Sequence, residues 1–316
     1  MSELNSEIVR ELFREQLDSW TQARGNYEAL GKVLTKQLIV DDFPFKVQFN
    51  PARIVSSAAK VDAKSIQERK CFLCEKNRPS VQKGLDFFFK GTDHYTVLIN
   101  PFPIFSRHLT IPLMDHQDQL INGRFDAMLA LAGKLTDYTI FYNGPKCGAS
   151  APDHFHFQAG IKGFMPIERE KLKKREIFRN SDTILSELLS GINGALVMES
   201  SSAESACELF NKTYSCLSIN EGEKEPMLNI LCWYENGIWT TVIFLRARHR
   251  PSCYFAEGDD NILISPASVD LGGVFITPLE KDFKKITEKD IKCILSEVLI
   301  SFDELHEVSE KIKKIL

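Results

Sequence analysis

Apolar side chains recur along this chain with two periods, and the period distinguishes helices from strands. From residue 5 to about residue 35 they return near every 3.6 residues, which predicts a helix, whereas residues 37–50 alternate in the manner of strands. A second helical period covers about 117–136, where Asp115 and His116 would open the helix. Further short apolar runs predict strands at residues 87–89, 95–99, 109–113 and 139–142.

The C-terminal half contains a strong hairpin signal. Two apolar runs, 229–234 and 240–250, flank the sequence Glu-Asn-Gly-Ile, and an Asn-Gly pair between such runs is typical of a tight turn between antiparallel strands. Arg246, Arg248 and Arg250 alternate, so on a strand they would share a face and could contact phosphate. A solvated strand face explains the same pattern equally well.

A weak internal repeat suggests two related halves. Residues 100–115 and 265–280 both contain a proline turn, a short loop, an apolar strand that ends near proline, and a charged helix start. Repeated sequence implies repeated architecture. We therefore expect an α+β chain that divides within the charged stretch 168–175, which we interpret as a connector or a solvated helix face. The expected division is 1–165 and 166–316.

The stretch from His154 to Gln158 is the strongest candidate for a functional site. In a strand, side chains alternate between faces, so His154, His156 and Gln158 point together. Phe155 and Phe157 would then pack behind them. Histidine acts near neutral pH as a nucleophile, a proton carrier or a metal ligand. The solvated edge of a sheet would give the same alternation, so the neighbouring residues must decide between the two interpretations.

Two polar loops are candidates for phosphate binding. The loop of residues 143–153 leads into the double-histidine stretch, and its glycines and small residues let backbone amides approach an anion closely. A second polar segment begins at Asn50 and contains Arg53 and Lys60, whose charges could hold phosphate. An ordinary surface loop is the alternative for this second segment.

Composition excludes several classes of function. The formal net charge of −4 gives no basic footprint for nucleic acid. No apolar run approaches the roughly 20 residues that span a bilayer. The N-terminal segment is charged and lacks the apolar region of a signal peptide, so we expect a cytoplasmic protein with neither nucleic acid nor a membrane as its partner.

The eight cysteines are too sparse for a disulfide scaffold. Cys71 and Cys74 form the one Cys-x-x-Cys pair, and this spacing lets two thiolates reach one zinc ion from a tight turn. Without a second such pair in the sequence, a closed zinc site would have to include histidines. A thioredoxin-like redox pair is the rival interpretation, but the βαβ surroundings typical of such a pair are not evident.

These motifs together resemble the histidine-triad superfamily, in the branch that contains galactose-1-phosphate uridylyltransferase, dinucleoside-tetraphosphate phosphorylase and GDP-hexose phosphorylases. The residues that carry the resemblance are the His-x-His-x-Gln motif at His154, His156 and Gln158, the loop from Asn143 to Ser150, and Asn100-Pro-Phe-Pro followed by His108 and His116. It spans residues 45–165 and reaches the second half through the repeat. The resemblance implies an α+β, histidine-triad-like fold with two related halves, each an antiparallel sheet flanked by helices.

The resemblance also implies an enzyme that works through a covalent nucleotidyl-histidine. His156 would attack the α-phosphate, and Gln158 would bind a non-bridging phosphate oxygen. We expect a nucleotidyltransferase or phosphorylase whose substrate is a nucleoside-diphosphate sugar or a dinucleoside polyphosphate. The nucleotide would be passed to phosphate, to a sugar phosphate or to water. We expect the protein to be a monomer or a homodimer. The expected substrate-binding residues are Asn50, Arg53, Lys60, Asn100, Asn143, Gly148, Ser150, Arg246 and Arg248.

Differences from the uridylyltransferases narrow the expected substrates. Those enzymes carry Pro between the histidines and Gly before the glutamine, and Phe155 and Phe157 at these positions disfavour galactose 1-phosphate and UDP-glucose. Two other functions stay open. A hydrolase of the superfamily would usually have a third histidine in place of Gln158, and a non-catalytic, zinc-stabilised nucleotide-binding protein would leave His156 idle.

A structural zinc site is a further implication of the resemblance. The ligand set of the uridylyltransferases transfers to Cys71, Cys74, His116 and His154, with His108 as the alternative to His116. Two sulfur and two nitrogen ligands suit tetrahedral zinc. A zinc ion bound through His154 would orient the strand that presents His156 and would not itself react.

Overall fold

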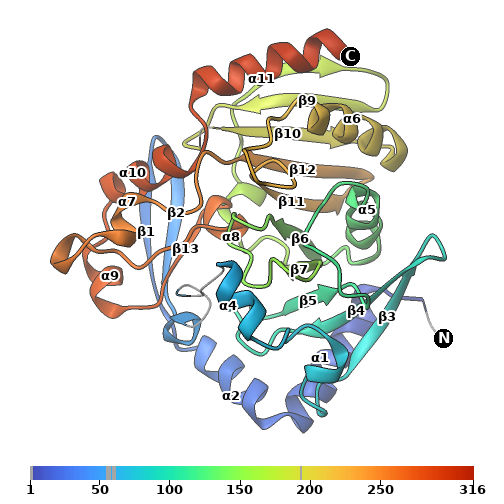
Figure 1. Cartoon of the computed structure of the whole chain (residues 1–316), viewed down its shortest axis with the longest axis vertical. Coiled ribbons are helices and arrows are strands. Elements are labelled where there is room, and N and C mark those ends of the chain that lie inside the picture. Colours follow the sequence, from blue (N-terminus) through green and yellow to red (C-terminus); the bar gives the residue numbers. More distant parts are fainter. Residues whose placement is uncertain (1–2, 55–57, 59–61, 193) are drawn as a thin grey trace.

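A large antiparallel sheet runs through both halves of the chain (Figure 1). The structure is a computed structural model that describes residues 3–54, 58, 62–192 and 194–316. In spatial order, the ten strands of this sheet are β3 (Gly84–Phe89), β4 (Asp93–Ile99), β5 (His108–Pro112), β7 (His156–Ile161), β6 (Tyr138–Asn143), β11 (Leu228–Glu235), β12 (Ile238–Leu245), β10 (Ala195–Ser200), β9 (Thr183–Leu188) and β8 (Lys174–Arg179).

The order of these strands confirms the α+β class with two related halves. From the outer edge to the centre, the first half runs β3-β4-β5-β7-β6 and the second half runs β8-β9-β10-β12-β11, which is the same sequence of steps. Each half inserts a helix after its third strand, α5 (Phe125–Lys134) in the first and α6 (Ala203–Ser215) in the second. The halves meet where β6 pairs with β11, with Asn143 opposite Asn229.

The two segments that the sequence repeat aligned are nevertheless not structurally equivalent. Residues 100–115 contain β5, whose counterpart in the second half is β10. Residues 265–280 instead contain α8 (Ser268–Leu271) and β13 (Val274–Thr277), which belongs to another sheet. Proline turns before short apolar strands recur for local reasons, so the two-half architecture was right and the alignment behind it was wrong.

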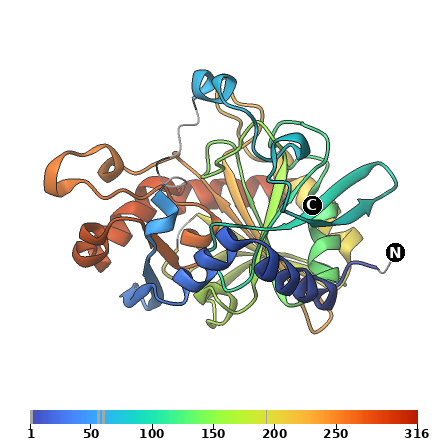
Figure 2. The same cartoon turned by 90° about the horizontal axis from the view of Figure 1, so that it is seen from below.

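The second sheet covers one face of the large sheet. It consists of β1 (Leu34–Val40), β2 (Phe43–Phe49) and β13, with β2 antiparallel to β1 and parallel to β13. Side chains of this small sheet share one core with α8 and α10 (Glu288–Val298). The opposite face is covered by α1 (Ser6–Ser19), α5, α6 and α11 (Phe302–Ile315), so Figure 2 shows helices on both sides of the large sheet.

The remaining short helices lie in connections: α2 (Thr21–Leu30), α4 (Ala63–Glu68), α7 (Ser252–Phe255), α9 (Glu280–Lys285), and the 3-10 turns η1 (Pro51–Arg53), η2 (Glu75–Asn77), η3 (Pro166–Glu168) and η4 (Gly258–Asp260). The predicted helix over residues 5–35 is two helices, because the backbone at Trp20 is extended. In the charged stretch 168–175, Glu168 ends the 3-10 turn η3, residues 169–173 form a connector, and Lys174 begins the edge strand β8, so the stretch contains no α-helix face. No helix in the described ranges is long and apolar enough to cross a membrane.

The predicted helix over 117–136 is wrong in its first part. The helix α5 begins at Phe125, and residues 115–124 form a loop. Gly123 has a φ of +75°, which a helix does not accommodate. The backbone N–H groups of the loop donate elsewhere, that of Ile121 to the carboxylate of Glu225 in the second half. A contact this distant in sequence overrides the local apolar period.

Candidate active site and metal centre

The double-histidine stretch straddles the start of β7. Phe155 and Phe157 lie in the core, with ring centroids 4.9 Å apart, which confirms the alternation from residue 155 onward. His156 and Gln158 lie on the opposite face of the strand, where Gln158 lines a pocket together with Ile104 and Phe141. His154 lies in the loop before the strand, so the prediction that it belongs to the same strand was wrong. The two histidines therefore occupy separate environments.

The imidazole of His156 is held in one tautomer by the backbone. Its Nδ1 lies 2.9 Å from the carbonyl oxygen of His154, and a carbonyl only accepts, so Nδ1 carries the proton and Nε2 a lone pair. The residue is 4% exposed, and burial lowers the pKa of His156 to about 4. A neutral imidazole with a free Nε2 has the electronic form that nucleophilic attack requires.

Gln158 is oriented by a second histidine. The backbone N–H of Ile104 donates to His108 Nδ1 at 3.2 Å, so the proton of His108 lies on Nε2, which donates to Gln158 Oε1 at 3.0 Å. Burial lowers the pKa of His108 to about 3, which keeps this ring neutral. The amide nitrogen of Gln158 makes no hydrogen bond within the part of the chain that the structure describes. The alternative metal ligand His108 thus lies beside Gln158 and away from the cysteines.

A pocket lies beside Gln158, between the two sheets. Both halves of one chain line it, with Arg53, Ile104, Phe141, Asn143 and Gln158 from the first, and Ser265, Ala267, Val269, Asp270 and Ile276 from the second. His156 lies two residues before Gln158 on the same strand face and is not among the lining residues. The pocket therefore requires the second half to be complete.

The half-buried Arg53 and the buried Asp270 give this pocket one basic and one acidic side chain. Arg53 Nη1 donates to the carbonyl of Phe102 at 2.8 Å, and burial lowers its pKa to about 10. Asp270 accepts hydrogen bonds from the backbone N–H groups of Ala267 (2.9 Å) and Ile276 (3.0 Å), and burial raises its pKa to about 6. Sequence reasoning missed Asp270, which resembles an ordinary carboxylate in the first turn of a short helix.

The loop after β6 is tied to the second half. Asn143 Oδ1 accepts hydrogen bonds from Asn229 Nδ2 (2.8 Å) and from the backbone N–H of Ser268 (2.9 Å). Gly148 has a φ of +91°, and a Cβ there would lie 2.5 Å from the Cβ of Ala267. The glycine is therefore required by close packing against the residue before α8.

The other predicted phosphate contacts have mainly structural partners. Asn50 Nδ2 donates to Gln48 Oε1 (3.2 Å) and to the carbonyl of Pro103 (3.1 Å). Asn100 Nδ2 donates to Thr110 Oγ1 at 3.0 Å, and its Oδ1 accepts from the N–H of Phe102 at 2.9 Å. Ser150 accepts through its carbonyl from Arg69 at 3.5 Å. Lys60 lies outside the described residues.

The alternating arginines of the second half do not share a strand face. The strand β12 ends at Leu245, so Arg246, Arg248 and Arg250 follow an irregular path and this prediction was wrong. The buried guanidinium of Arg246 donates to Asn229 Oδ1 and to the carbonyls of Val298, Pro266, Arg248 and His249. Arg248 pairs with Glu297 at 3.2 Å. Neither Arg246 nor Arg248 lines the pocket.

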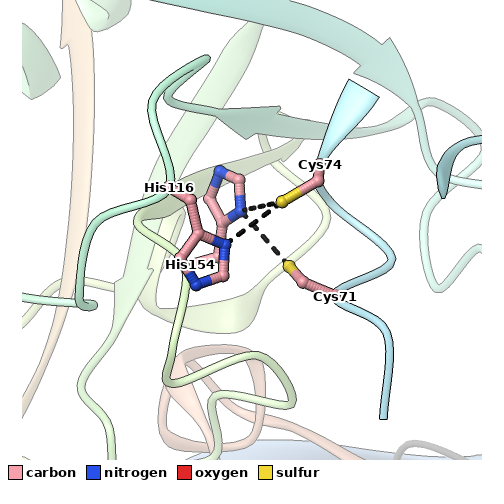
Figure 3. A group of neighbouring side chains, drawn as sticks. All are labelled: Cys71, Cys74, His116 and His154. Atoms are coloured by element: carbon pink, nitrogen blue, oxygen red, sulfur yellow. Dashed lines mark hydrogen bonds between the residues drawn. The ribbon is translucent and has the colours of Figure 1, made fainter. Parts of the chain in front are cut away.

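Two cysteines and two histidines converge at a separate centre (Figure 3). The ligand atoms of Cys71, Cys74, His116 and His154 all lie within 4.8 Å of one another. Cys71 Sγ lies 3.2 Å from His154 Nδ1, and Cys74 Sγ lies 3.1 Å from His116 Nδ1. The Nε2–H of His154 donates to the carbonyl of Leu113 at 2.7 Å, which leaves Nδ1 free to face a metal ion. This donor set could hold a tetrahedral ion such as zinc.

Glu225 connects the second half to the neighbourhood of His156. Its carboxyl oxygens contact the hydroxyl of Tyr142 and the backbone N–H of Ile121. The same Tyr142 hydroxyl lies 2.9 Å from the carbonyl of Gln119. A protonated Glu225 that donates to Tyr142 would leave the tyrosine proton for Gln119. Burial raises the pKa of Glu225 to about 7, in agreement with that arrangement.

We expect Glu225 to reduce stability as the pH rises. Its folded pKa of about 7 exceeds the ordinary value of 4.5, so the folded state keeps a proton that the unfolded state loses. The contribution of Glu225 to the free energy of unfolding is fully present below the pKa of the unfolded state. It falls by up to about 3 kcal/mol as the pH rises through the pKa of the folded state. Urea denaturation between about pH 4.5 and pH 7.5 should show a smaller decline for Glu225→Gln. The facing groups Tyr142, Tyr214 and Cys147 have raised pKa values and do not titrate in this window. Equal declines for both proteins would contradict this expectation.

Comparisons with known proteins agree with this geometry. Residues 12–161 match the model of a domain of unknown function, DUF4922, and residues 166–316 match the GDPGP1-like C-terminal domain. The structure is similar to that of yeast Ap4A phosphorylase Apa2, with a TM-score of 0.53 at 15% identity over 89% of this chain and 97% of that chain. Apa2 in complex with AMP gives a TM-score of 0.52 at 14% identity, over 91% and 97% of the two chains.

These structural similarities show a shared fold. The search of curated proteins finds no match. The two family models leave few residues of the chain unmatched, and the order of strands is repeated in both halves. The GDPGP1-like match of the second half and the fold shared with Ap4A phosphorylase support the resemblance to the branch of the histidine-triad superfamily that contains galactose-1-phosphate uridylyltransferase, dinucleoside-tetraphosphate phosphorylase and GDP-hexose phosphorylases.

Proposed function

We propose that this protein is a nucleotidyltransferase or phosphorylase that carries a nucleoside monophosphate on His156. The observation that carries the proposal is the bond between His156 Nδ1 and the carbonyl of His154, because it leaves Nε2 as a free nucleophile. The GDPGP1-like match and the fold shared with a phosphorylase of Ap4A support the same chemistry. The substrate class is a nucleoside-diphosphate sugar or a dinucleoside polyphosphate.

The proposed reaction has two displacements. His156 Nε2 attacks the α-phosphorus, a P–N bond forms, and the P–O bond to the remaining phosphate breaks, so that a sugar phosphate or nucleotide leaves with the bonding electrons. An oxygen of the acceptor phosphate then attacks the same phosphorus, and the P–N bond breaks. The imidazole is regenerated, and the nucleoside monophosphate leaves as a nucleoside diphosphate. A covalent intermediate of this kind divides one difficult step into two easier ones.

Polar groups near His156 would stabilise the charge on the transferred phosphate. Gln158 Nε2 would donate to a non-bridging oxygen, since its Oε1 is occupied by His108. Backbone amides of the loop at Gly148 and Ser150 would do the same, and such a donor is typically worth about 3 kcal/mol of barrier. Arg53 would bind a further phosphate in the pocket.

The division of labour between the halves follows from the pocket. We propose that residues 1–165 form the catalytic half and that residues 166–316 complete the substrate site through Ser265 and Asp270. The four residues Cys71, Cys74, His116 and His154 would hold a structural zinc ion. This ion would fix the loop that ends at His156 and take no part in bond making.

Product analysis with labelled phosphate tests the proposal. The protein is incubated with GDP-, ADP- and UDP-hexoses and with dinucleoside polyphosphates, each with ³²P-labelled inorganic phosphate. We expect the label in the β-position of a nucleoside diphosphate with at least one substrate. Release of unlabelled nucleoside monophosphate would identify a hydrolase, and binding with neither turnover nor a nucleotidyl-histidine adduct across the panel would indicate a non-catalytic nucleotide-binding protein. Either result would refute the phosphorylase.

A further inference from the structure

We propose that Gln119 is a positioning residue that clamps the nucleophile His156 to the end of β6. The inference rests on the proposed function and extends it to a residue that contacts no substrate. Gln119 lies in the loop between β5 and α5 and is fully buried. Its side chain bonds to backbone groups on both sides of the loop 144–155.

The amide of Gln119 takes the place of a missing sheet partner. Its Oε1 accepts from the backbone N–H of His156 at 2.7 Å, and its Nε2 donates to the carbonyls of His156 and Asn143, both at 3.0 Å. The pairing of β6 with β7 ends at Phe141 and Gln158. Beyond that point the two strands separate, and both backbone groups of His156 bond to the glutamine. On the side that faces β6, the backbone of His156 is thus held by one side chain, while β5 lies on the other side with Pro112 opposite His156.

The backbone of Gln119 is fixed by the same region. Its N–H donates to the carbonyl of Pro152 at 3.2 Å, and its carbonyl accepts from the hydroxyl of Tyr142. Two residues earlier, the carbonyl of Gln117 accepts from the N–H of Phe155 at 2.6 Å. The segment that carries His116 therefore runs along the loop that carries His154, which couples the metal centre to the nucleophile through short backbone contacts.

Loss of the clamp should slow the chemical step and leave binding intact. The pocket contacts of Gln158 and Arg53 do not include Gln119. A displacement of about 1 Å at a reacting group can cost about 100-fold in rate. Gln119→Met retains the length and apolar volume of the side chain and removes its three hydrogen bonds. We expect nucleotidyl-enzyme formation in a single turnover to slow about 100-fold, with the Kd for the nucleotide substrate and the zinc content unchanged.

Gln16 provides a matched control. It is also fully buried, donates to the carbonyl of Val81 at 3.1 Å and accepts from the N–H of Lys83 at 2.9 Å, on α1 and away from the pocket. The Gln16→Met protein should have a lowered Tm, like the Gln119→Met protein, but should form the nucleotidyl-enzyme at the wild-type rate. If both methionine variants label equally fast, the positioning role is refuted and the proposed function stands.

A second variant keeps the proposal testable if Gln119→Met does not fold. Gln119→Glu retains an acceptor for the N–H of His156 but places an oxygen against the two carbonyls, where only a protonated carboxyl can donate. We expect the ratio of its labelling rate to the wild-type rate to rise as the pH falls from 8 to 5, and a ratio of one at every pH would refute the clamp. Failure of the wild-type protein to label any substrate would instead refute the proposed function, and the clamp with it.

Discussion

Alanine in place of His156 is expected to abolish formation of the nucleotidyl-enzyme and to lower turnover by about 10⁴-fold or more, since removal of a nucleophile leaves only the contribution of binding and electrostatics. The wild-type protein should carry an acid-labile, base-stable label after incubation with a nucleotide substrate labelled in the α-phosphate. The variant should carry none. Intact-mass spectrometry measures the same adduct without radioactivity.

His94→Ala is the matched control for this experiment. His94 is another histidine on a strand of the large sheet, but its ring stacks on Phe88 and bonds to Asp86 at the surface. This variant should label and turn over like the wild-type protein. A His156→Ala variant that still forms the adduct would place the nucleophile elsewhere and contradict the assignment.

The double substitution of Cys71 and Cys74 by serine is expected to remove bound zinc and to destabilise the protein by several kcal/mol. In a structural site, the free energy of metal binding is folding free energy, and hydroxyl groups are poor zinc ligands. Elemental analysis should find about one zinc per wild-type chain and none in the variant. Thermal denaturation with and without a chelator should show the accompanying fall in Tm.

Two controls separate this effect from a general loss of cysteine or histidine. Cys207→Ser combined with Cys293→Ser changes two thiols outside the metal centre and should keep the zinc. His108→Ala should also retain it, because His108 faces Gln158. Full zinc in the Cys71→Ser, Cys74→Ser protein would refute the ligand set, and zinc loss in His108→Ala would revive the alternative ligand.

Local patterns in the sequence were sufficient for most of the fold. The alternating strands and the Asn236-Gly237 turn of the β11–β12 hairpin follow from side-chain periodicity and from two residues with positive φ. The prediction of a helix from residue 117 was wrong because the backbone N–H of Ile121 donates a hydrogen bond to Glu225, which is distant in the sequence. No local period encodes such a contact.

In the candidate site, too, local patterns were predicted from the sequence and contacts between distant residues were not. The spacing of His156 and Gln158 is visible in the sequence because both lie on one strand face. The residues that orient them are not visible in the sequence. His108 contacts Gln158, and Gln119 contacts His156, only after β5 and the loop that follows it have folded beside β7. Asp270 enters the pocket from the second half by the same kind of tertiary contact. Their roles became clear only from atomic positions.

The pairing of β6 with β11 has a consequence for how this chain could be divided. Neither strand is an outer edge of the sheet, and each hides its unpaired backbone groups against the other. A fragment that ended near residue 165 would expose β6, a six-residue strand that is buried along its whole length, to any complementary chain, including a second copy of itself. A cut between the two matched regions would therefore turn an interior strand pair into two open sheet edges.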